Sequence, residues 1–238
     1  MLATLGRVLH VRPSRALSDG AVLGPGLSTR AAAARVEDAF LGPGRGIAVV
    51  DGALSEAALA ELREFAAEST VFFDLKHGHV GANLEDGFAS GLLLQLSDAL
   101  RDTLPRLTAG GTLALWSVWA YKYVTGPHGI RPHADEGELS INCWLTPDGD
   151  NLGNGTAHGG LRLFHRDQPD GLDFATANRD FRRVRELLDD EPPVEVEYRS
   201  NRCVVFRSSL FHETVPFAFR EGLLSYRTNL VFMYGSRR

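Results

Sequence analysis

Three residues in the C-terminal half, His133, Asp135 and His212, have the types and the order of a metal site. Two neutral imidazoles and one carboxylate on one side of Fe(II) leave coordination positions open for other ligands. His133 and Asp135 are two residues apart, so in an extended chain both side chains point to the same side. The trio therefore predicts a redox-active iron centre.

The His-x-Asp pattern occurs twice, so its context must decide between the copies. His133-Ala134-Asp135 precedes residues 139–145, which alternate polar and apolar side chains like a strand. The second copy, His165-Arg166-Asp167, closes a short apolar run and leads into Gln168-Pro169-Asp170-Gly171, which is typical of a turn. We therefore favour His133 as the ligand and keep His165 as the weaker candidate.

Two later strands are predicted to return to the same site. Residues 202–206 are rich in β-forming side chains, and His212 follows them; Arg227 opens a strongly apolar strand at 228–234. A guanidinium binds a carboxylate through two parallel hydrogen bonds, which a lysine cannot reproduce. Arg227 is thus a candidate anion-binding residue, with a salt bridge to an acid at the rim as the alternative.

An aromatic strand precedes the first metal ligands. By alternation, every second residue from Leu113 to Tyr123 shares one face, which places Tyr121 and Tyr123 together. Asn142 lies on the following predicted strand. These three residues are candidates for completing the anion site, with ordinary core packing as the alternative for the tyrosines.

Several short strings together resemble the iron(II)- and 2-oxoglutarate-dependent dioxygenase superfamily, in the prolyl-4-hydroxylase-like branch and its bacterial subgroup. They span roughly residues 70 to 235 and comprise Trp119-Ala120-Tyr121-Lys122-Tyr123, His133-Ala134-Asp135, Asn142-Cys143-Trp144-Leu145-Thr146-Pro147-Asp148, Gly159-Gly160-Leu161, Asn201-Arg202-Cys203-Val204-Val205-Phe206, Phe211-His212-Glu213-Thr214 and Arg227-Thr228-Asn229-Leu230. The resemblance assigns His133, Asp135 and His212 to the iron and Arg227 to 2-oxoglutarate. Prolyl-4-hydroxylases usually carry a lysine at the latter position, after a shorter gap, so Arg227 argues against a prolyl substrate.

The resemblance implies both a fold and a chemistry. The fold would be α+β, with a distorted double-stranded β-helix (a cupin-like jelly roll) buttressed by N-terminal helices. Fe(II), the co-substrate 2-oxoglutarate and O2 would oxidise an unactivated C–H bond, by hydroxylation, desaturation or cyclisation, releasing succinate and CO2. Halogenating relatives of this mechanism replace the carboxylate ligand with a small residue, so Asp135 argues against halogenation.

The chain is expected to form one enzyme domain behind a short leader. Residues 1–30 are rich in Gly and Pro and predict a loosely ordered lead-in, followed by a dioxygenase domain over 31–238. Residues 31–111 are expected to be mainly helical support and 112–238 the jelly-roll core. The expected segments are helices at 31–40, after Ser55, from Ser90 and at 178–188, and a short strand at 47–50.

Composition limits the partners. The 238 residues are 44% hydrophobic and carry a net charge of −5, so the chain has no basic field for nucleic acid or for an anionic membrane. No stretch approaches 18 apolar residues, and the N-terminus does not match a signal peptide, so no membrane span and a cytoplasmic location are expected. Cys143 and Cys203 are expected as buried free thiols.

The substrate is predicted only as a class: a small polar metabolite, with amino acids and natural-product intermediates as candidates. The loops expected to cover the site are 76–87, 148–158 and 166–178, and Arg131 and Arg162 are candidates for a substrate carboxylate. Two alternatives stay open: a protein side-chain hydroxylase of the same mechanism, and a non-oxidising cupin-like metal-binding protein. The sequence does not decide the oligomeric state.

Overall fold

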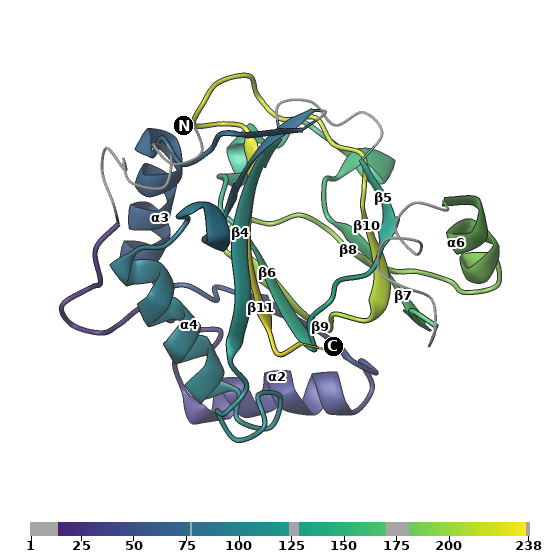
Figure 1. The fold of residues 1–238 in the computed structure, drawn as a ribbon, viewed down its shortest axis with the longest axis horizontal. Helices are drawn as coiled ribbons and strands as arrows, with labels where there is room; N and C mark the ends of the chain where they lie inside the picture. The colour runs from purple at the N-terminus through teal and green to yellow at the C-terminus, as the bar shows by residue number, and fades with distance from the viewer. Residues whose placement is uncertain (1–13, 77, 124–128, 170–180, 237–238) are drawn as a thin grey trace.

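Two antiparallel sheets form the centre of the protein in a computed structural model that describes residues 14–76, 78–123, 129–169 and 181–236. The major sheet has seven strands in the order β1-β9-β6-β11-β4-β3-β2, and the minor sheet has four in the order β5-β10-β7-β8. Figure 1 shows the two sheets facing each other across the interior. This arrangement confirms the predicted α+β class with a jelly-roll core.

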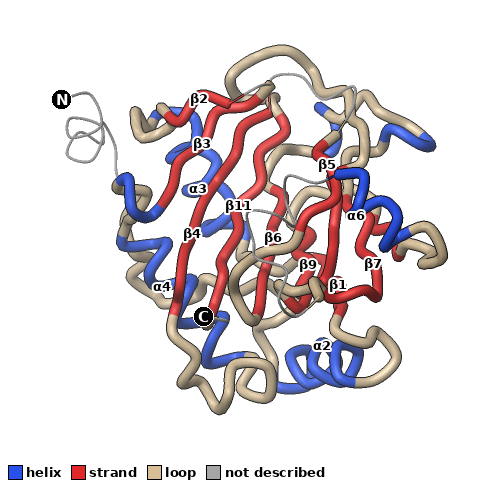
Figure 2. The backbone as a smooth tube through the Cα atoms, turned by 45° about the vertical axis from the view of Figure 1, so that its right-hand side comes forward, coloured by secondary structure: helices blue, strands red, loops and turns tan. Residues whose placement is uncertain are grey.

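The strands of the major sheet are β1 (Ile47–Asp51), β2 (Asp74–Lys76), β3 (His79–Asn83), β4 (Leu115–Tyr123), β6 (Leu139–Trp144), β9 (Arg202–Arg207) and β11 (Arg227–Tyr234). Those of the minor sheet are β5 (Ile130–His133), β7 (Leu161–Asp167), β8 (Val194–Val196) and β10 (Leu210–Thr214). Strand β11 lies in the middle of the major sheet, paired with β4 on one side and β6 on the other. Figure 2 shows β4, β11 and β6 running side by side.

Three helices cover the outer side and one end of the major sheet: α2 (Arg30–Leu41), α3 (Glu56–Glu68) and α4 (Gly91–Thr103). Each has a hydroxyl residue as its N-cap: Thr29, Ser55 or Ser90. The side chain of this residue accepts a hydrogen bond from a backbone N–H of the first turn. These helices confirm the three that the sequence predicts. None of the described helices is long and apolar enough to cross a bilayer.

The largest hydrophobic core lies between these helices and the major sheet. It joins inward residues of α3 and α4, such as Leu62 and Leu96, to Val118, Leu230 and Phe232 on the sheet. All five side chains are at most 2% exposed. Because strand residues alternate between faces, the neighbouring residues of β4 and β11 point the other way, into the space between the sheets.

The fourth described helix, α6 (Phe181–Leu188), lies outside the minor sheet (Figure 1). Val184 and Leu188 pack with Phe164 and Phe211 in a small separate core. The helix predicted at 178–188 is therefore present from Phe181, and residues 178–180 lie outside the described part of the chain.

Part of the N-terminal segment that was expected to be loosely ordered packs against the main core. Val22 and Leu27 are each 1% exposed and belong to the main core, and the backbone N–H of Leu17 bonds to Gln95. Close packing of the chain at Gly24 and Gly26 against residues 50–54 leaves no room there for a Cβ atom. Residues 22–27 are therefore docked in the core and not loosely ordered as expected, while residues 1–13 lie outside the described ranges.

The prediction of free thiols is wrong: Cys143 and Cys203 form a disulfide. Strands β6 and β9 are neighbours, and their register places Cys143 directly opposite Cys203, with Cα atoms 4.1 Å apart. The two cysteines are 60 residues apart in the chain, so their juxtaposition depends on strand order. The pairing also removes the support that free thiols lent to a cytoplasmic location.

Candidate metal centre

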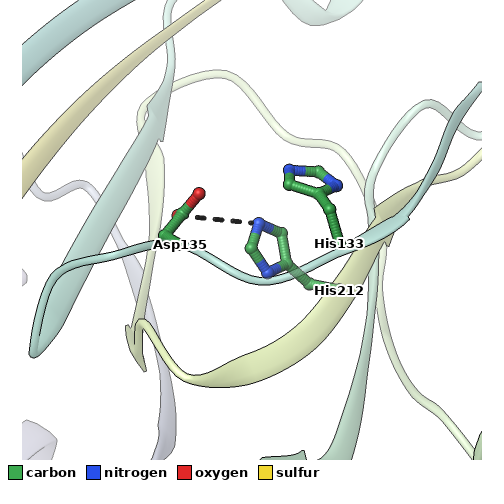
Figure 3. A group of neighbouring side chains, drawn as sticks. All are labelled: His133, Asp135 and His212. Atoms are coloured by element: carbon green, nitrogen blue, oxygen red, sulfur yellow. Dashed lines mark ion pairs between the residues drawn. The ribbon is translucent and has the colours of Figure 1, made fainter. Parts of the chain in front are cut away.

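The structure brings His133, Asp135 and His212 together (Figure 3). Their nitrogen and oxygen ligand atoms all lie within 4.8 Å of one another. His133 ends β5 and His212 lies within β10, and these two residues are direct cross-strand partners. Asp135 follows two residues after His133, and its backbone N–H donates to the carbonyl of Ser208 at 2.8 Å. The geometry is that of three ligands aimed at one ion.

Backbone carbonyls orient both imidazoles. Nδ1 of His133 lies 2.9 Å from the carbonyl oxygen of Arg131, and Nδ1 of His212 lies 3.0 Å from that of Leu210. A carbonyl only accepts hydrogen bonds, so each Nδ1 carries the proton and each neutral ring has its lone pair on Nε2. Such a partner on the other ring nitrogen is usual for metal-binding histidines. Both rings are thereby prepared to bind a metal through Nε2.

Burial keeps His212 neutral. It lowers the pKa of the His212 imidazole to about 4, with a further lowering from His133 and an opposing effect of Asp135. The Asp135 carboxylate lies 3.7 Å from Nε2 of His212 and accepts a hydrogen bond of 3.2 Å from the hydroxyl of Ser140. His212 is therefore uncharged at neutral pH, and the hydroxyl of Ser140 holds the Asp135 side chain in place, an arrangement that suits a divalent ion.

A cavity of about 50 Å³ opens beside the three ligands, between the two sheets. Tyr121, Tyr123 and Asn142 all line it, so the structure gathers these predicted residues at the metal centre. Burial raises the pKa of both tyrosines, so each keeps its hydroxyl proton at neutral pH. The remaining lining residues are Trp119, Ile130, Leu161, Phe206, Thr214, Asn229 and Val231.

Asn229 is a cavity residue that the sequence analysis did not select. Its Nδ2 donates to Oδ1 of Asn142 at 2.7 Å, which joins β11 to β6 across the cavity wall. Oδ1 of Asn229 and Nδ2 of Asn142 are buried and have no partner among the described residues. Strand alternation could have identified it. Asn229 lies two residues after Arg227 on the same strand, so both side chains point to the same face of the sheet.

Arg227 is 1% exposed and forms no ion pair with any acid among the described residues. Its Nε donates to the carbonyl of Gly159 at 2.7 Å, while Nη1 is buried without a described partner. The guanidinium carbon lies 4.8 Å from the Tyr123 ring centroid and 5.4 Å from that of Phe217. Arg227 is not among the residues that line the cavity, but its guanidinium packs against the ring of Tyr123, which is. The rim salt bridge considered as its alternative is therefore not seen.

A buried, unpaired guanidinium is costly unless an anion completes it. Arg227 therefore fits a carboxylate, and the unpaired amide atoms of Asn142 and Asn229 fit further oxygen or nitrogen groups. The donor set of two histidines and one carboxylate fits Fe(II). The residues present thus suit both an iron ion and an acidic co-substrate.

The other candidates lie elsewhere. His165 on β7 is not part of the metal cluster, and Asp167 pairs with Arg207 at 3.1 Å, so the second His-x-Asp copy forms no metal site with the described residues. Arg162 forms ion pairs of 2.6 Å with Glu195 and 3.4 Å with Glu213, so it is already compensated. Arg131 also has interactions of its own.

The expected covering loops are partly regular structure. Residues 76–87 contain strand β3 and a short 3-10 helix, and His79 on β3 packs its ring 4.9 Å from Tyr121 and 5.1 Å from Tyr123. The segment 148–158 carries two short 3-10 helices. Strand β7 extends to Asp167, and residues 170–178 lie outside the described part of the chain.

No protein-family model matches the chain, and no curated protein matches its sequence. Solved structures do match. The epimerase SnoN from nogalamycin biosynthesis, in complex with Fe3+, α-ketoglutarate and nogalamycin RO, has a TM-score of 0.59 and 20% identity, covering 86% of this chain and 84% of its own.

Two further structures extend the comparison. A Pseudomonas putida prolyl-4-hydroxylase has a TM-score of 0.55 and 20% identity, covering 87% of this chain and 100% of its own. HygX from Streptomyces hygroscopicus, with nickel, 2-oxoglutarate and hygromycin B bound, has a TM-score of 0.55 and 16% identity, covering 81% and 83%. The chain therefore has the fold of these three proteins, which agrees with the fold that the resemblance of its short motifs implies.

Proposed function

We propose that the protein is an Fe(II)- and 2-oxoglutarate-dependent dioxygenase. The observation that carries the proposal is the convergence of His133, Asp135 and His212, with both imidazoles oriented by backbone carbonyls. Arg227 is buried and has no ion pair with an acid among the described residues, which supports an acidic co-substrate and argues against a non-oxidising metal-binding protein, which needs no such group. When bound, iron, 2-oxoglutarate and O2 together supply the oxidation of a C–H bond, with succinate and CO2 as by-products.

The protein's own residues would perform three tasks in this reaction. The three ligands would hold the metal on one side, because their donor atoms converge from the minor sheet and the residues next to it. Arg227 would bind the far carboxylate of 2-oxoglutarate, with Tyr121, Tyr123 and Asn142 as the polar neighbours. The aromatic side chains of Trp119 and Phe206 would limit water at the centre.

We propose a small polar metabolite as substrate, with natural-product intermediates and amino acids as the first classes to test. The net charge of −5 offers no attraction to nucleic acid, and SnoN and HygX were solved with nogalamycin RO and hygromycin B bound. A cytoplasmic location, where Fe(II) is kept reduced, is part of this proposal. The arginine at position 227 continues to argue against a prolyl substrate.

The decisive experiment is an anaerobic optical titration with Fe(II), followed by 2-oxoglutarate. A visible iron-to-ketoacid charge-transfer band is expected in the wild type and in His165→Ala, and its loss is expected in His133→Ala. His165→Ala is a matched control because it disrupts the second His-x-Asp copy, which lies outside the cluster. If iron bound but no band formed, the non-oxidising alternative would replace this proposal.

A further inference from the structure

A second cavity, of about 420 Å³, lies on the other face of the strands that carry the anion site. We call it the rear cavity; its walls include Lys122, Thr228, Ala66, Leu145, Leu223 and Leu224. Lys122 stands between Tyr121 and Tyr123 on β4, and Thr228 follows Arg227 on β11 as the direct partner of Lys122. Strand alternation therefore turns these two residues away from the metal and toward α3.

The Lys122 side chain is only 3% exposed. Its ammonium lies 3.9 Å from the centroid of the Phe72 ring and forms no ion pair or hydrogen bond with any described residue. Burial lowers the pKa of Lys122 to about 8. A buried ammonium without an anion is unfavourable, and a bound carboxylate would offset this cost of burial.

The other charged groups of the rear cavity are largely engaged. Arg63 donates to the carbonyl of Leu145 and to the hydroxyl of Ser200, both at 2.6 Å. Asp150 pairs with Arg220 at 3.2 Å. Glu64 and Glu68 of α3 also line the cavity, and both have interactions of their own. Among the described residues, Lys122 thus has no hydrogen bond or ion pair, unlike Arg63 and Asp150.

The remaining walls are mainly apolar. Ala66, Ala67, Leu145 and Pro147 line the interior. Leu223 and Leu224 also line the cavity and are 57% and 72% exposed, so they form an apolar edge at the surface. A volume of about 420 Å³ falls within the usual range of small-molecule pockets. The cavity therefore offers one buried cation, an apolar interior and an apolar edge.

We propose that the rear cavity binds a small aliphatic carboxylate, with its carboxylate on Lys122 and its hydrocarbon chain extending toward Leu223 and Leu224. The ligand class follows from charge and shape alone. The proposal does not depend on the dioxygenase activity, because the residues of this cavity lie on the other face of the sheet from the metal ligands.

Calorimetric titration of the full-length protein with octanoate tests the proposal. Octanoate is expected to bind, whereas octan-1-ol and octylammonium bind at least about tenfold more weakly, since each lacks the anion. Octanoate affinity should also decrease as pH rises through 8, because Lys122 then loses its charge. Absence of octanoate binding at millimolar concentration, or equal binding of octylammonium at Glu64 and Glu68, would overturn the proposal.

Two variants localise the binding. Lys122→Met keeps the length of the side chain and should weaken octanoate binding at least about tenfold. Leu224→Asp changes an exposed residue, so it should fold normally and also weaken binding. His133→Ala should bind octanoate like the wild type, which separates this cavity from the metal centre. Wild-type affinity in both Lys122→Met and Leu224→Asp would show that octanoate binds elsewhere.

Discussion

The proposed metal ligands and the proposed carboxylate-binding residues of the centre come from different sheets. His133 and His212 lie on the minor sheet, whereas Arg227, Tyr123 and Asn142 lie on the major sheet. The register of the minor sheet shifts on both sides of His212. Strand β11 instead pairs with β6 without a shift over Asn229–Tyr234. Irregular pairing on the minor sheet changes the direction of the His212 side chain. On the major sheet, regular alternation is sufficient to place the proposed anion-binding residues on the same face.

This division between the sheets predicts that metal binding and co-substrate binding can be lost separately. A change on the minor sheet should remove the metal, and with it everything that depends on the metal. A change on the major sheet should leave the metal in place and weaken the co-substrate. Four measurements test this contrast, and the largest effect is expected first.

His212→Ala should abolish Fe(II) binding and oxidation, because one of three ligands of a prepared site is lost. Iron content after anaerobic loading and dialysis measures the effect, and thermal unfolding checks that the variant folds. Retention of iron and activity by this variant would contradict the assignment of the whole centre.

Arg227→Met should leave Fe(II) binding intact and weaken 2-oxoglutarate binding, since a buried charge-assisted pair is worth about 2 to 5 kcal/mol. The concentration of 2-oxoglutarate that produces half of the charge-transfer band measures the loss. Arg162→Met is the matched control, because Arg162 pairs with Glu195 away from the cavity. Equal effects of the two variants would mean that Arg227 has a structural role.

Replacing both Cys143 and Cys203 with alanine should lower the free energy of unfolding by about 2 to 5 kcal/mol, because a long loop is no longer closed. The pair lies in the major sheet, so iron binding at the minor sheet should persist. Urea unfolding with and without reductant provides the measurement. A wild type that reductant does not destabilise would argue against a stabilising role for the disulfide.

Acid should destabilise the metal-free protein through His212. The pKa of this residue is about 4 in the folded protein and about 6.5 in an unfolded chain. Between these values the unfolded state binds a proton that the folded state does not, so stability decreases as pH falls from 6.5 to 4, by at most about 1.4 kcal/mol per pH unit.

The control for this pH effect is His212→Ala, which lacks the titrating group. Its free energy of unfolding should depend less on pH over the same range, as measured by urea unfolding at several pH values. Parallel curves for the wild type and the variant would show that His212 is not buried in its neutral form.

Local patterns in the sequence were sufficient to predict much of the fold. Ser55 and Ser90 cap helices where predicted, and the alternation that groups Tyr121 with Tyr123 is observed at the cavity. Such features depend on neighbours within a few residues, through capping hydrogen bonds and strand periodicity. The choice of His133 over His165 likewise rested on local context, and the geometry of the cluster agrees with it.

Features that depend on which strands are neighbours could not be predicted from the sequence. Cys143 meets Cys203 because β6 and β9 are neighbours. Lys122 is buried, with no ion pair among the described residues, because α3 and the chain around Leu223 enclose it. Arg162 is compensated because β7 lies beside β8 and β10. Residue types and spacing thus determined which chemistry we propose for this protein, whereas tertiary packing decided which charges are paired, because pairing depends on distance in space.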